Sequence, residues 1–192
     1  MGASMIVGIL ALQGAFREHE EMLTRMGIPC LQVRLPHDLA KVDRLIMPGG
    51  ESTTIGKLLV MYDLLEPIRQ RVRAGMPIWG TCAGAILLSS NIVDGRADQP
   101  ALHLMDITSR RNAFGSQLDS FEADVSVAGL DAPFHTVFIR APILENPHGA
   151  CQAIATLPDG RVVAARQGHM LATSFHPELT HDDRIHRLFL SL

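Results

Sequence analysis

The chain has 192 residues, of which 47% are hydrophobic and 19% charged, and a formal net charge of −3 at pH 7. This length suits one domain with a full core, and we expect a single domain over residues 1–192. The charge leaves no basic footprint for nucleic acid, and no apolar run approaches the roughly 20 residues that span a bilayer. Cys30, Cys82 and Cys151 are odd in number and far apart, which favours free thiols in a cytoplasmic protein.

The first half of the chain alternates short apolar runs with helical patterns. Met5 to Leu12 is a continuous apolar run, as expected of a strand buried on both faces, and it is too short for a signal peptide. The expected strands cover 5–12, 30–33 and 44–47, and the expected helices about 16–26, 55–62 and 64–74. This order predicts an α/β fold with a three-layer, doubly wound, mostly parallel sheet.

The second half changes character. From residue 106 onward the apolar segments are short and strand-like, at 122–127, 136–139, 153–157, 162–166 and 170–175. Pro158-Asp159-Gly160 and Gly168-His169 are typical of hairpin turns, so we expect antiparallel strands added to the parallel core. Thr180-His181-Asp182-Asp183 has the pattern of a capping box before a last amphipathic helix that extends to Leu192.

The central motif is Gly80-Thr81-Cys82-Ala83-Gly84, with an apolar run on each side. A sharp strand-to-helix turn crowds its own backbone, and Gly80 and Gly84 supply the small residues it needs. The pattern predicts a nucleophile elbow with Cys82 at its apex. There the thiol would face the positive end of the following helix, which favours the thiolate. The alternative is that Cys82 is a buried small hydrophobe.

A second motif, Ser174-Phe175-His176-Pro177-Glu178, offers a base and a group to orient it. Pro177 biases His176 toward an extended conformation, in which residues two apart point to the same side. Glu178 would then fix the ring of His176. The alternatives are a solvated polar loop and a zinc deaminase signature, but the latter needs a downstream Pro-Cys-x-x-Cys. We expect no metal site, because His176, His181 and His186 are spaced five apart.

The third motif is Pro48-Gly49-Gly50-Glu51-Ser52. Two glycines at a strand end let backbone N–H groups turn toward a ligand. Together with the N–H of Ala83, those of Gly49 and Gly50 are candidates for an oxyanion hole. The alternative is a plain strand-to-helix turn capped by Ser52 or Thr53. A phosphate loop is excluded because the Gly-Lys-Ser/Thr pattern is missing.

In this order the three motifs resemble the class I (triad) glutamine amidotransferases, which have a flavodoxin-like fold. The chain is most similar to one branch, the glutaminase subunits of pyridoxal 5'-phosphate synthase, over nearly its whole length. The departures are Ala85, where a larger aliphatic is common, and a slightly short loop after Pro142. Beyond the three motifs, the resemblance is carried by Leu10-Ala11-Leu12-Gln13-Gly14, Arg111-Asn112-Ala113-Phe114-Gly115, Asp119-Ser120-Phe121-Glu122, Phe138-Ile139-Arg140-Ala141-Pro142 and Leu179-Thr180.

This resemblance implies hydrolysis of an amide through a thioester, a reaction that needs no cofactor. Cys82 would attack the side-chain amide of L-glutamine, His176 would protonate the departing ammonia, and Glu178 would orient His176. Hydrolysis of the γ-glutamyl thioester would release L-glutamate. An Arg fork suits the α-carboxylate of glutamine, and an acceptor suits its α-ammonium group. By resemblance, the substrate is lined by Gly50, Glu51, Ser52, Arg111, Ile139 and Arg140, although surface solvation is the usual fate of such arginines.

The resemblance also implies a partner, the synthase subunit that builds pyridoxal 5'-phosphate for vitamin B6 biosynthesis within a large heteromeric complex. Ammonia would pass to it internally. We hypothesise that docking reorients the Gly49-Gly50 backbone to complete the oxyanion hole, with Gln13 close to the contact. Three alternatives stay open: a cysteine hydrolase or peptidase, a non-catalytic binding module, and a glutaminase that serves a synthase for histidine, purine or folate precursors.

Overall fold

The structure, a computed structural model, describes residues 5–111 and 120–192. Its strands are β1 (Val7–Leu10), β2 (Cys30–Val33), β3 (Arg44–Met47), β4 (Ile78–Thr81), β5 (Ser89–Val93), β6 (Met105–Arg110), β7 (Ser120–Val125), β8 (Phe134–Ile139), β9 (Ile143–Glu145), β10 (Gln152–Thr156), β11 (Val162–Gln167) and β12 (Met170–Thr173). Its helices are α1 (Phe16–Arg25), α2 (Pro36–Leu39), α3 (Ser52–Met61), α4 (Leu65–Arg73), α5 (Ala83–Leu88), the 3-10 helix η1 (Pro177–Leu179) and α6 (Arg184–Leu190).

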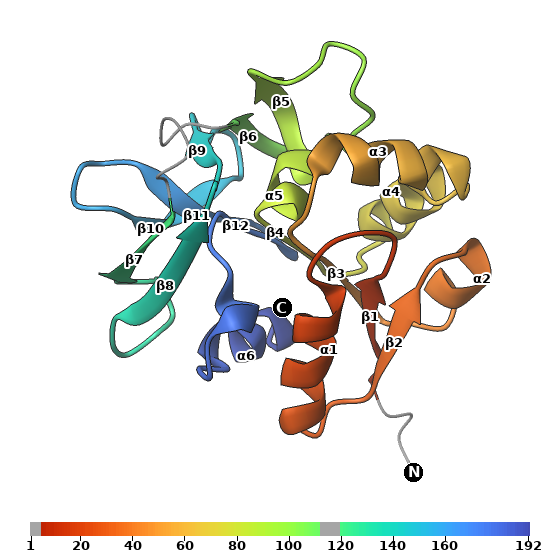
Figure 1. Cartoon of the computed structure of the whole chain (residues 1–192), viewed down its shortest axis with the longest axis horizontal. Coiled ribbons are helices and arrows are strands. Elements are labelled where there is room, and N and C mark those ends of the chain that lie inside the picture. Colours follow the sequence, from red (N-terminus) through yellow and green to blue (C-terminus); the bar gives the residue numbers. More distant parts are fainter. Residues whose placement is uncertain (1–4, 112–119) are drawn as a thin grey trace.

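Within the described residues, ten strands form one sheet in the order β2-β1-β3-β4-β12-β11-β9-β6-β5, with β10 paired to β11 (Figure 1). The first five strands of this order are all parallel. Because β2 and β3 lie on opposite sides of β1, the chain reverses its winding there. Ligands of doubly wound sheets bind at such a switch point, outside the carboxyl ends of the strands. The predicted motifs follow β1, β3, β4 and β12 at this edge.

The other half of the sheet is mostly antiparallel. β11 pairs antiparallel with β9, β10 and β12, and the two predicted hairpin turns connect β10 to β11 and β11 to β12. β12 differs from the expectation, since it also pairs in parallel with β4 and so completes the parallel core. β7 and β8 form a separate two-stranded sheet. The expected α/β architecture with added antiparallel strands is therefore confirmed.

Alternating residues of the buried strands build two cores, one on each face of the sheet. Ile78 of β4 packs in one core with α3, α4 and α5, whereas its neighbour Trp79 packs in the other with α1 and α6. In β3, Leu45 and Ile46 divide in the same way. Figure 1 shows α1 and α6 side by side, apart from α3 and α4. This two-sided burial explains why β1 is a continuous apolar run.

The predicted start of the last helix is wrong. α6 begins at Arg184, and its first flanking residue, Asp183, makes no side-chain cap. The hydroxyl of Thr180 instead accepts the N–H of Asp182 at 3.2 Å and donates to the carbonyl of Pro177 at 2.9 Å. The capping-box pattern is thus used to fold the turn that follows η1. The strands β5, β6 and β9 were not expected from the sequence.

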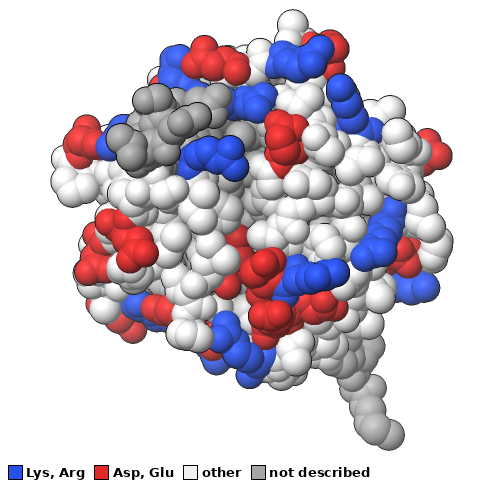
Figure 2. All heavy atoms as spheres, in the orientation of Figure 1, with Lys and Arg blue, Asp and Glu red and all other residues white. Residues whose placement is uncertain are grey.

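Charged side chains of both signs are interspersed over the face in view (Figure 2). Among the described residues, no helix is both long and apolar enough to cross a membrane. The same part of the chain contains no group of three or more His, Cys, Asp or Glu arranged to hold a metal ion.

Gly56 lies inside α3, where an alanine normally stabilises a helix by about 1 kcal/mol. We expect the opposite for Gly56→Ala, because its Cβ would overlap the carbonyl oxygen of Pro100. Overpacking of this kind costs about 1–3 kcal/mol of unfolding free energy, which urea titration measures. Gly95→Ala is the control, since the one close neighbour of its Cβ would be the terminal Cγ2 of Ile92, at 2.8 Å, with Gln99 and Arg111 in ordinary contact at 3.6 and 3.7 Å. A Gly56→Ala protein as stable as the parent would contradict the prediction.

Candidate active site

Cys82 occupies the strained turn that the sequence predicts between β4 and α5. Its backbone has φ 48° and ψ −104°, a combination that side chains rarely adopt. A Cβ on Gly80 would overlap the backbone of Gly84, and a Cβ on Gly84 would overlap the carbonyl oxygen of Met47. The N–H of Cys82 donates to the carbonyl of Thr173 on β12 at 2.8 Å. Neighbouring strands therefore hold the apex, and Cys82 is 6% exposed.

His176 and Glu178 form a buried pair behind the thiol. Nδ1 of His176 lies 2.7 Å from Oε1 of Glu178, and the two residues are 7% and 4% exposed. The expected contact is present, but its backbone origin differs from the expectation. His176 has φ −110° and ψ 81°, and Pro177 starts the 3-10 turn of η1, which folds Glu178 back toward the ring.

The pKa of His176 is raised to about 10. Burial lowers it, but the hydrogen bonds to Cys82 and Glu178 and the charges of those two groups raise it further. Burial also raises the pKa of Glu178, yet the neighbouring His19 and His176 hold it below its usual value. An ionised Glu178 beside a protonated His176 is the arrangement that a proton donor in this place requires.

A pocket of about 400 Å³ opens at the carboxyl edge of the sheet. Glu178 lies behind His176 and is not part of the pocket wall, and Ala83 is buried behind Cys82. The predicted residues that line the pocket are Gln13, Gly49, Gly50, Glu51, Ser52, Cys82, Arg111, Ile139, Arg140 and His176; Gly14, Ala15, Ile86, Pro142 and Leu179 join them. The structure thus brings the three motifs together at one cavity.

Glu51 forms the cap of α3, so the alternative that Ser52 or Thr53 caps this helix is wrong. Its carboxylate accepts the N–H groups of Thr53 and Thr54 at 3.2 and 2.7 Å. Burial raises the pKa of Glu51, but the hydrogen bonds from these threonines and the charge of Arg111 lower it more. Arg111 lies 3.1 Å from Oε1 of Glu51 and also donates to Gln99 at 3.1 Å. The pair therefore stands as a fixed ion pair in the pocket wall.

The loop after β1 holds the Gly49-Gly50 peptide. The N–H of Ala15 donates to the carbonyl of Gly49 at 2.9 Å, and the N–H of Glu51 donates to Oε1 of Gln13 at 2.8 Å. Gly14, with φ 99°, approaches so closely that a Cβ would overlap the carbonyl oxygen of Gly49. In a trans peptide the N–H points opposite to the carbonyl. The N–H of Gly50 therefore points away from this loop.

Gly49, in the segment that follows β3, lies against both His176 and Cys82. A Cβ placed on it would lie 2.5 Å from Cε1 of His176 and 3.3 Å from Cβ of Cys82. Any side chain there would push the ring of His176 aside. Ala83, next to Cys82, is the first residue of α5, and the N–H groups of a first helical turn have no partner within the helix.

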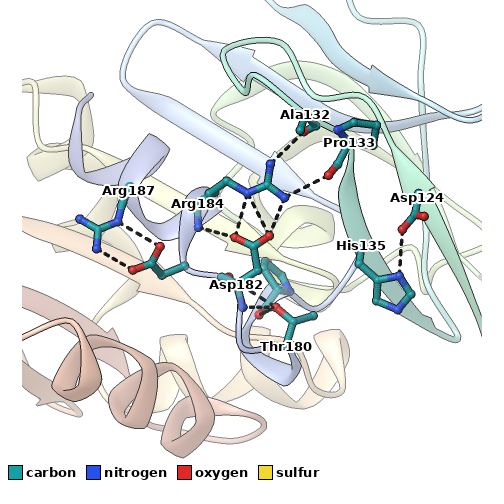
Figure 3. Close-up of polar contacts among 10 residues, drawn as sticks. Asp124, Ala132, Pro133, His135, Thr180, Asp182, Arg184 and Arg187 are labelled. Atoms are coloured by element: carbon teal, nitrogen blue, oxygen red, sulfur yellow. Dashed lines mark hydrogen bonds and ion pairs between the residues drawn. The ribbon is translucent and has the colours of Figure 1, made fainter.

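The segment that follows Glu178 is anchored on two sides. Arg184 donates to the carbonyls of Ala132 and Pro133 at 2.9 and 3.0 Å, and its Nε lies 2.9 Å from Oδ2 of Asp182 (Figure 3). These contacts tie the turn after η1 to the loop before β8. They restrict the movement of the segment that carries Glu178.

The sequence interpretation missed the polar residues behind Glu178, which are His19, Thr81 and His186. All three are fully buried. His19 lies on the apolar face of α1 together with Met22 and Leu23. A histidine at such a position is a usable signal, because a buried imidazole needs a polar partner.

Comparisons with known proteins agree with this geometry. A model of the SNO glutamine amidotransferase family matches residues 9–192. A Roseiflexus sp. (strain RS-1) protein named pyridoxal 5'-phosphate synthase subunit PdxT is 69% identical over 189 residues, with 98% of this chain and 100% of the relative covered. A protein of the same name from Herpetosiphon aurantiacus is 65% identical over 190 residues, again with 98% and 100% covered. A solved crystal structure of a glutamine amidotransferase is 50% identical, with a TM-score of 0.91 over 96% of this chain and 97% of that chain.

The chain belongs to the SNO glutamine amidotransferase family. The resemblance drawn from the motifs is therefore confirmed, and so is the enzyme class, a glutamine amidohydrolase. Two stretches that carried part of the resemblance, residues 112–115 and 119, lie outside the described residues.

The buried His186 predicts a loss of stability in acid. Burial is the largest of the causes that lower its pKa from 6.5 to about 2. Below pH 6.5 the unfolded chain binds a proton that the folded chain does not, so the stability contribution is complete above that pH and falls as the pH falls. The expected slope is about 1.4 kcal/mol per pH unit. Urea unfolding between pH 7.5 and 5 should show it, and His186→Leu should flatten the profile.

His135 provides a control of opposite sign. Hydrogen bonds to Asp124 and Glu122 raise its pKa, so its contribution is present below the ordinary histidine pKa and is lost as the pH rises (Figure 3 draws the contact with Asp124). His135→Gln should therefore leave the acid slope no flatter than in the parent. If His186→Leu and the parent lost stability equally between pH 7.5 and 5, the prediction would be wrong.

Proposed function

We propose that the chain is the glutaminase subunit of a pyridoxal 5'-phosphate synthase. It hydrolyses L-glutamine to L-glutamate and ammonia and supplies the ammonia to the synthase subunit for vitamin B6 biosynthesis. The observation that carries this proposal is one pocket in which the strained Cys82 faces the buried His176–Glu178 pair. The 69% identity to a protein named as a subunit of that synthase supports the choice of branch.

In the first half of the reaction, the sulfur of Cys82 attacks the amide carbon of the glutamine side chain. The carbonyl electrons move to the oxygen, which the N–H groups of Ala83 and Gly50 stabilise. The intermediate collapses, His176 gives its proton to the leaving nitrogen, and ammonia departs. A γ-glutamyl thioester on Cys82 remains. Glu178 keeps the ring of His176 oriented throughout, through the 2.7 Å contact.

In the second half, His176 takes a proton from water as the water attacks the thioester carbon. The new tetrahedral intermediate expels the sulfur of Cys82, and L-glutamate leaves. The high pKa of His176, about 10, favours the proton-loaded state at the start of the cycle. The second half needs His176 without its proton, and the departing ammonia has just taken it.

Charge complementarity supports the proposed substrate residues. Glutamine is a zwitterion at its α-carbon, and the pocket wall offers the guanidinium of Arg111 next to the carboxylate of Glu51, 3.1 Å apart. Arg140 and Ile139 also line the pocket, and Arg140 is exposed and has φ 45°. Gly50 and Ser52 complete the lining. Ser52 contributes a buried hydroxyl that has no hydrogen-bond partner among the described residues.

The partner subunit explains how ammonia is kept from water. Free ammonia is protonated at neutral pH and diffuses away, so release is useful only inside a complex. We place the contact near Gln13, because Ala15 donates to the carbonyl of Gly49 and Gln13 accepts the N–H of Glu51, so the loop holds both sides of Gly50. Displacing this loop frees the peptide to rotate its N–H toward the oxyanion. Glycine at both positions keeps that rotation cheap.

Two attributes of the protein belong to the same proposal. The chain acts as a single domain over residues 1–192, because both cores share the one ten-stranded sheet. It acts in the cytoplasm, where its three free cysteines stay reduced.

The rival functions make different demands on the same pocket. A cysteine hydrolase or peptidase of this architecture needs Cys82 and His176 but not Glu51, Arg111 or Arg140, and it would cleave peptides. A glutaminase of another branch would be activated by another synthase. A non-catalytic binding module would leave Cys82 unreactive toward a glutamine affinity label.

The first prediction from this function concerns activation by the synthase subunit. Ammonia release from glutamine should rise at least 10-fold when the pure chain is mixed with the synthase subunit, because docking completes the oxyanion hole, one donor of which contributes about 10²–10³ in rate. Cys82→Ser should abolish release in the same assay. A coupled glutamate dehydrogenase reaction measures both.

The possible outcomes of this assay distinguish between the candidate functions. No release by a folded chain with the synthase subunit present would put the partner or the substrate in error, and peptide cleavage would then favour the hydrolase. Equal rates with and without the synthase subunit would refute the reorientation of the Gly49-Gly50 peptide but not the chemistry.

A second prediction concerns Arg111. Arg111→Leu in the complex should raise KM for glutamine by about 10- to 100-fold, because a charged hydrogen bond to the α-carboxylate contributes roughly 1.5–3 kcal/mol. The kcat value should change less than 5-fold, about 1 kcal/mol, since Arg111 does not touch the reacting atoms. Initial rates over a range of glutamine concentrations give both constants. A loss of unfolding free energy with an unchanged KM would mean that Arg111 only braces Glu51 and Gln99.

A further inference from the structure

His19 lies directly behind the catalytic pair, although it is more than 150 residues away from it in the sequence. It projects from α1 into the core and is fully buried. Its Nε2 lies 3.5 Å from Oε2 of Glu178 and 3.3 Å from the hydroxyl of Thr81. The ring also contacts Trp79 edge-on, with centroids 5.4 Å apart. Packing thus fixes the imidazole with one nitrogen toward the catalytic carboxylate.

Without His19, only one of the two carboxylate oxygens of Glu178 has a hydrogen-bond partner among the described residues. Oε1 binds Nδ1 of His176 at 2.7 Å, whereas Oε2 is buried and has no hydrogen-bond partner among the described residues. A buried charged oxygen without a donor carries a large desolvation penalty. Nε2 of His19 faces Oε2 and needs to approach by about half an ångström to reach normal hydrogen-bond distance.

The tautomer of His19 follows from its two neighbours. A carboxylate only accepts, so a lone pair on Nε2 would repel Oε2, and a proton there is favoured. Nδ1 then carries the lone pair and accepts from Nε2 of His186, which lies 3.1 Å away. The opposite assignment would bury a proton on Nδ1 of His186, which has no partner among the described residues. His186 therefore holds His19 in the form that donates to Glu178.

The charge state of His19 completes the argument. Burial lowers its pKa, and the charge of His176 adds to this, against the opposing charges of Glu178 and Glu18. His186 is kept neutral too, mainly by burial. A neutral donor orients a carboxylate without cancelling its charge. A cation in the place of His19 would compete with His176 for that charge.

We propose that His19 is a positioning residue: held by His186 with its proton on Nε2, it donates to Oε2 of Glu178 and so fixes the carboxylate that orients His176. This inference rests on the proposed glutaminase function. His19 touches neither the substrate nor the sulfur of Cys82, and it acts on the reaction only through Glu178.

The test is glutaminase kinetics of the complex with the synthase subunit, measured from pH 6 to pH 10.5. His19→Leu removes the donor, so kcat should fall by about 10- to 100-fold, as expected for a displaced catalytic group, with KM within 2-fold. The alkaline limb of kcat/KM should move down by roughly one pH unit, because the imidazolium of His176 loses part of its partner. His19→Gln puts an amide N–H near the position of Nε2 and should restore most of kcat. His19→Asn puts it near Nδ1 and should not.

The variants separate positioning from folding. If His19→Leu does not fold, the comparison of His19→Gln with His19→Asn decides alone, and equal kcat values for these two would overturn the proposal. A folded His19→Leu with the parental kcat and pH profile would also overturn it. His169→Leu is the matched control: it removes a histidine that binds the carbonyl of Val72 at 2.8 Å, at the opposite end of β12, and should leave both readouts unchanged. An inactive parental complex would instead refute the glutaminase function.

Discussion

The strained backbone at Cys82 is the constraint on which the active site depends. A turn with φ 48° and ψ −104° exists only where its surroundings hold it. Here the carbonyl of Thr173 on β12 accepts the N–H of Cys82, and the absence of side chains at Gly80 and Gly84 lets α5 start against β3 and β4. The same parallel pairing that fixes the elbow also brings the end of β12, and with it His176, next to the thiol. The strand pairing that defines the fold therefore also sets the geometry of the active site.

The second determinant is a line of buried polar groups that runs from the pocket into the core. Cys82, His176, Glu178, His19 and His186 follow one another, and the distances along the last three contacts are 2.7, 3.5 and 3.1 Å. One end is charged and faces the pocket, whereas the other end is neutral because burial lowers the pKa of both inner histidines. Because the inner histidines are neutral, His176 is the cationic partner of the negative charge on Glu178. This arrangement makes the fold sensitive to acid. Below pH 6.5 the unfolded chain protonates both inner histidines, whereas their lowered pKa values keep them neutral in the folded chain.

Short sequence patterns predicted the features that depend on residues close together in the chain. The parallel strands, the glycine-flanked elbow and the His176-x-Glu178 pair each have a signature within a few residues. The strands β5 and β6 have none, because their buried hydroxyls, Ser89 and Ser109, satisfy one another at 2.6 Å across 20 residues. The position of His19 on the apolar face of α1 signals a buried histidine, but not its role, because its partners lie in β4, η1 and α6. The prediction that Thr180 caps the last helix is wrong because Arg184 binds Asp182, and the helix begins only at Arg184. No local pattern specifies this contact. The roles of the substrate-lining residues and the single-domain organisation stay predictions.

α1 connects the two halves of the catalytic machinery. The loop that precedes α1, Gln13 to Ala15, holds the Gly49-Gly50 segment, and His19, the fourth residue of α1, approaches Glu178. A rigid helix transmits a displacement at its start to every side chain along it. Under the proposed function, a partner that moves the loop at Gln13 would therefore act on the Gly49-Gly50 peptide and on the carboxylate behind His176 at the same time. Neither effect requires the strand that carries Cys82 to move, so the strained elbow stays fixed while the groups around it change. In the proposed function, activation through α1 would leave Cys82 in place and adjust the groups that stabilise charge on either side of it.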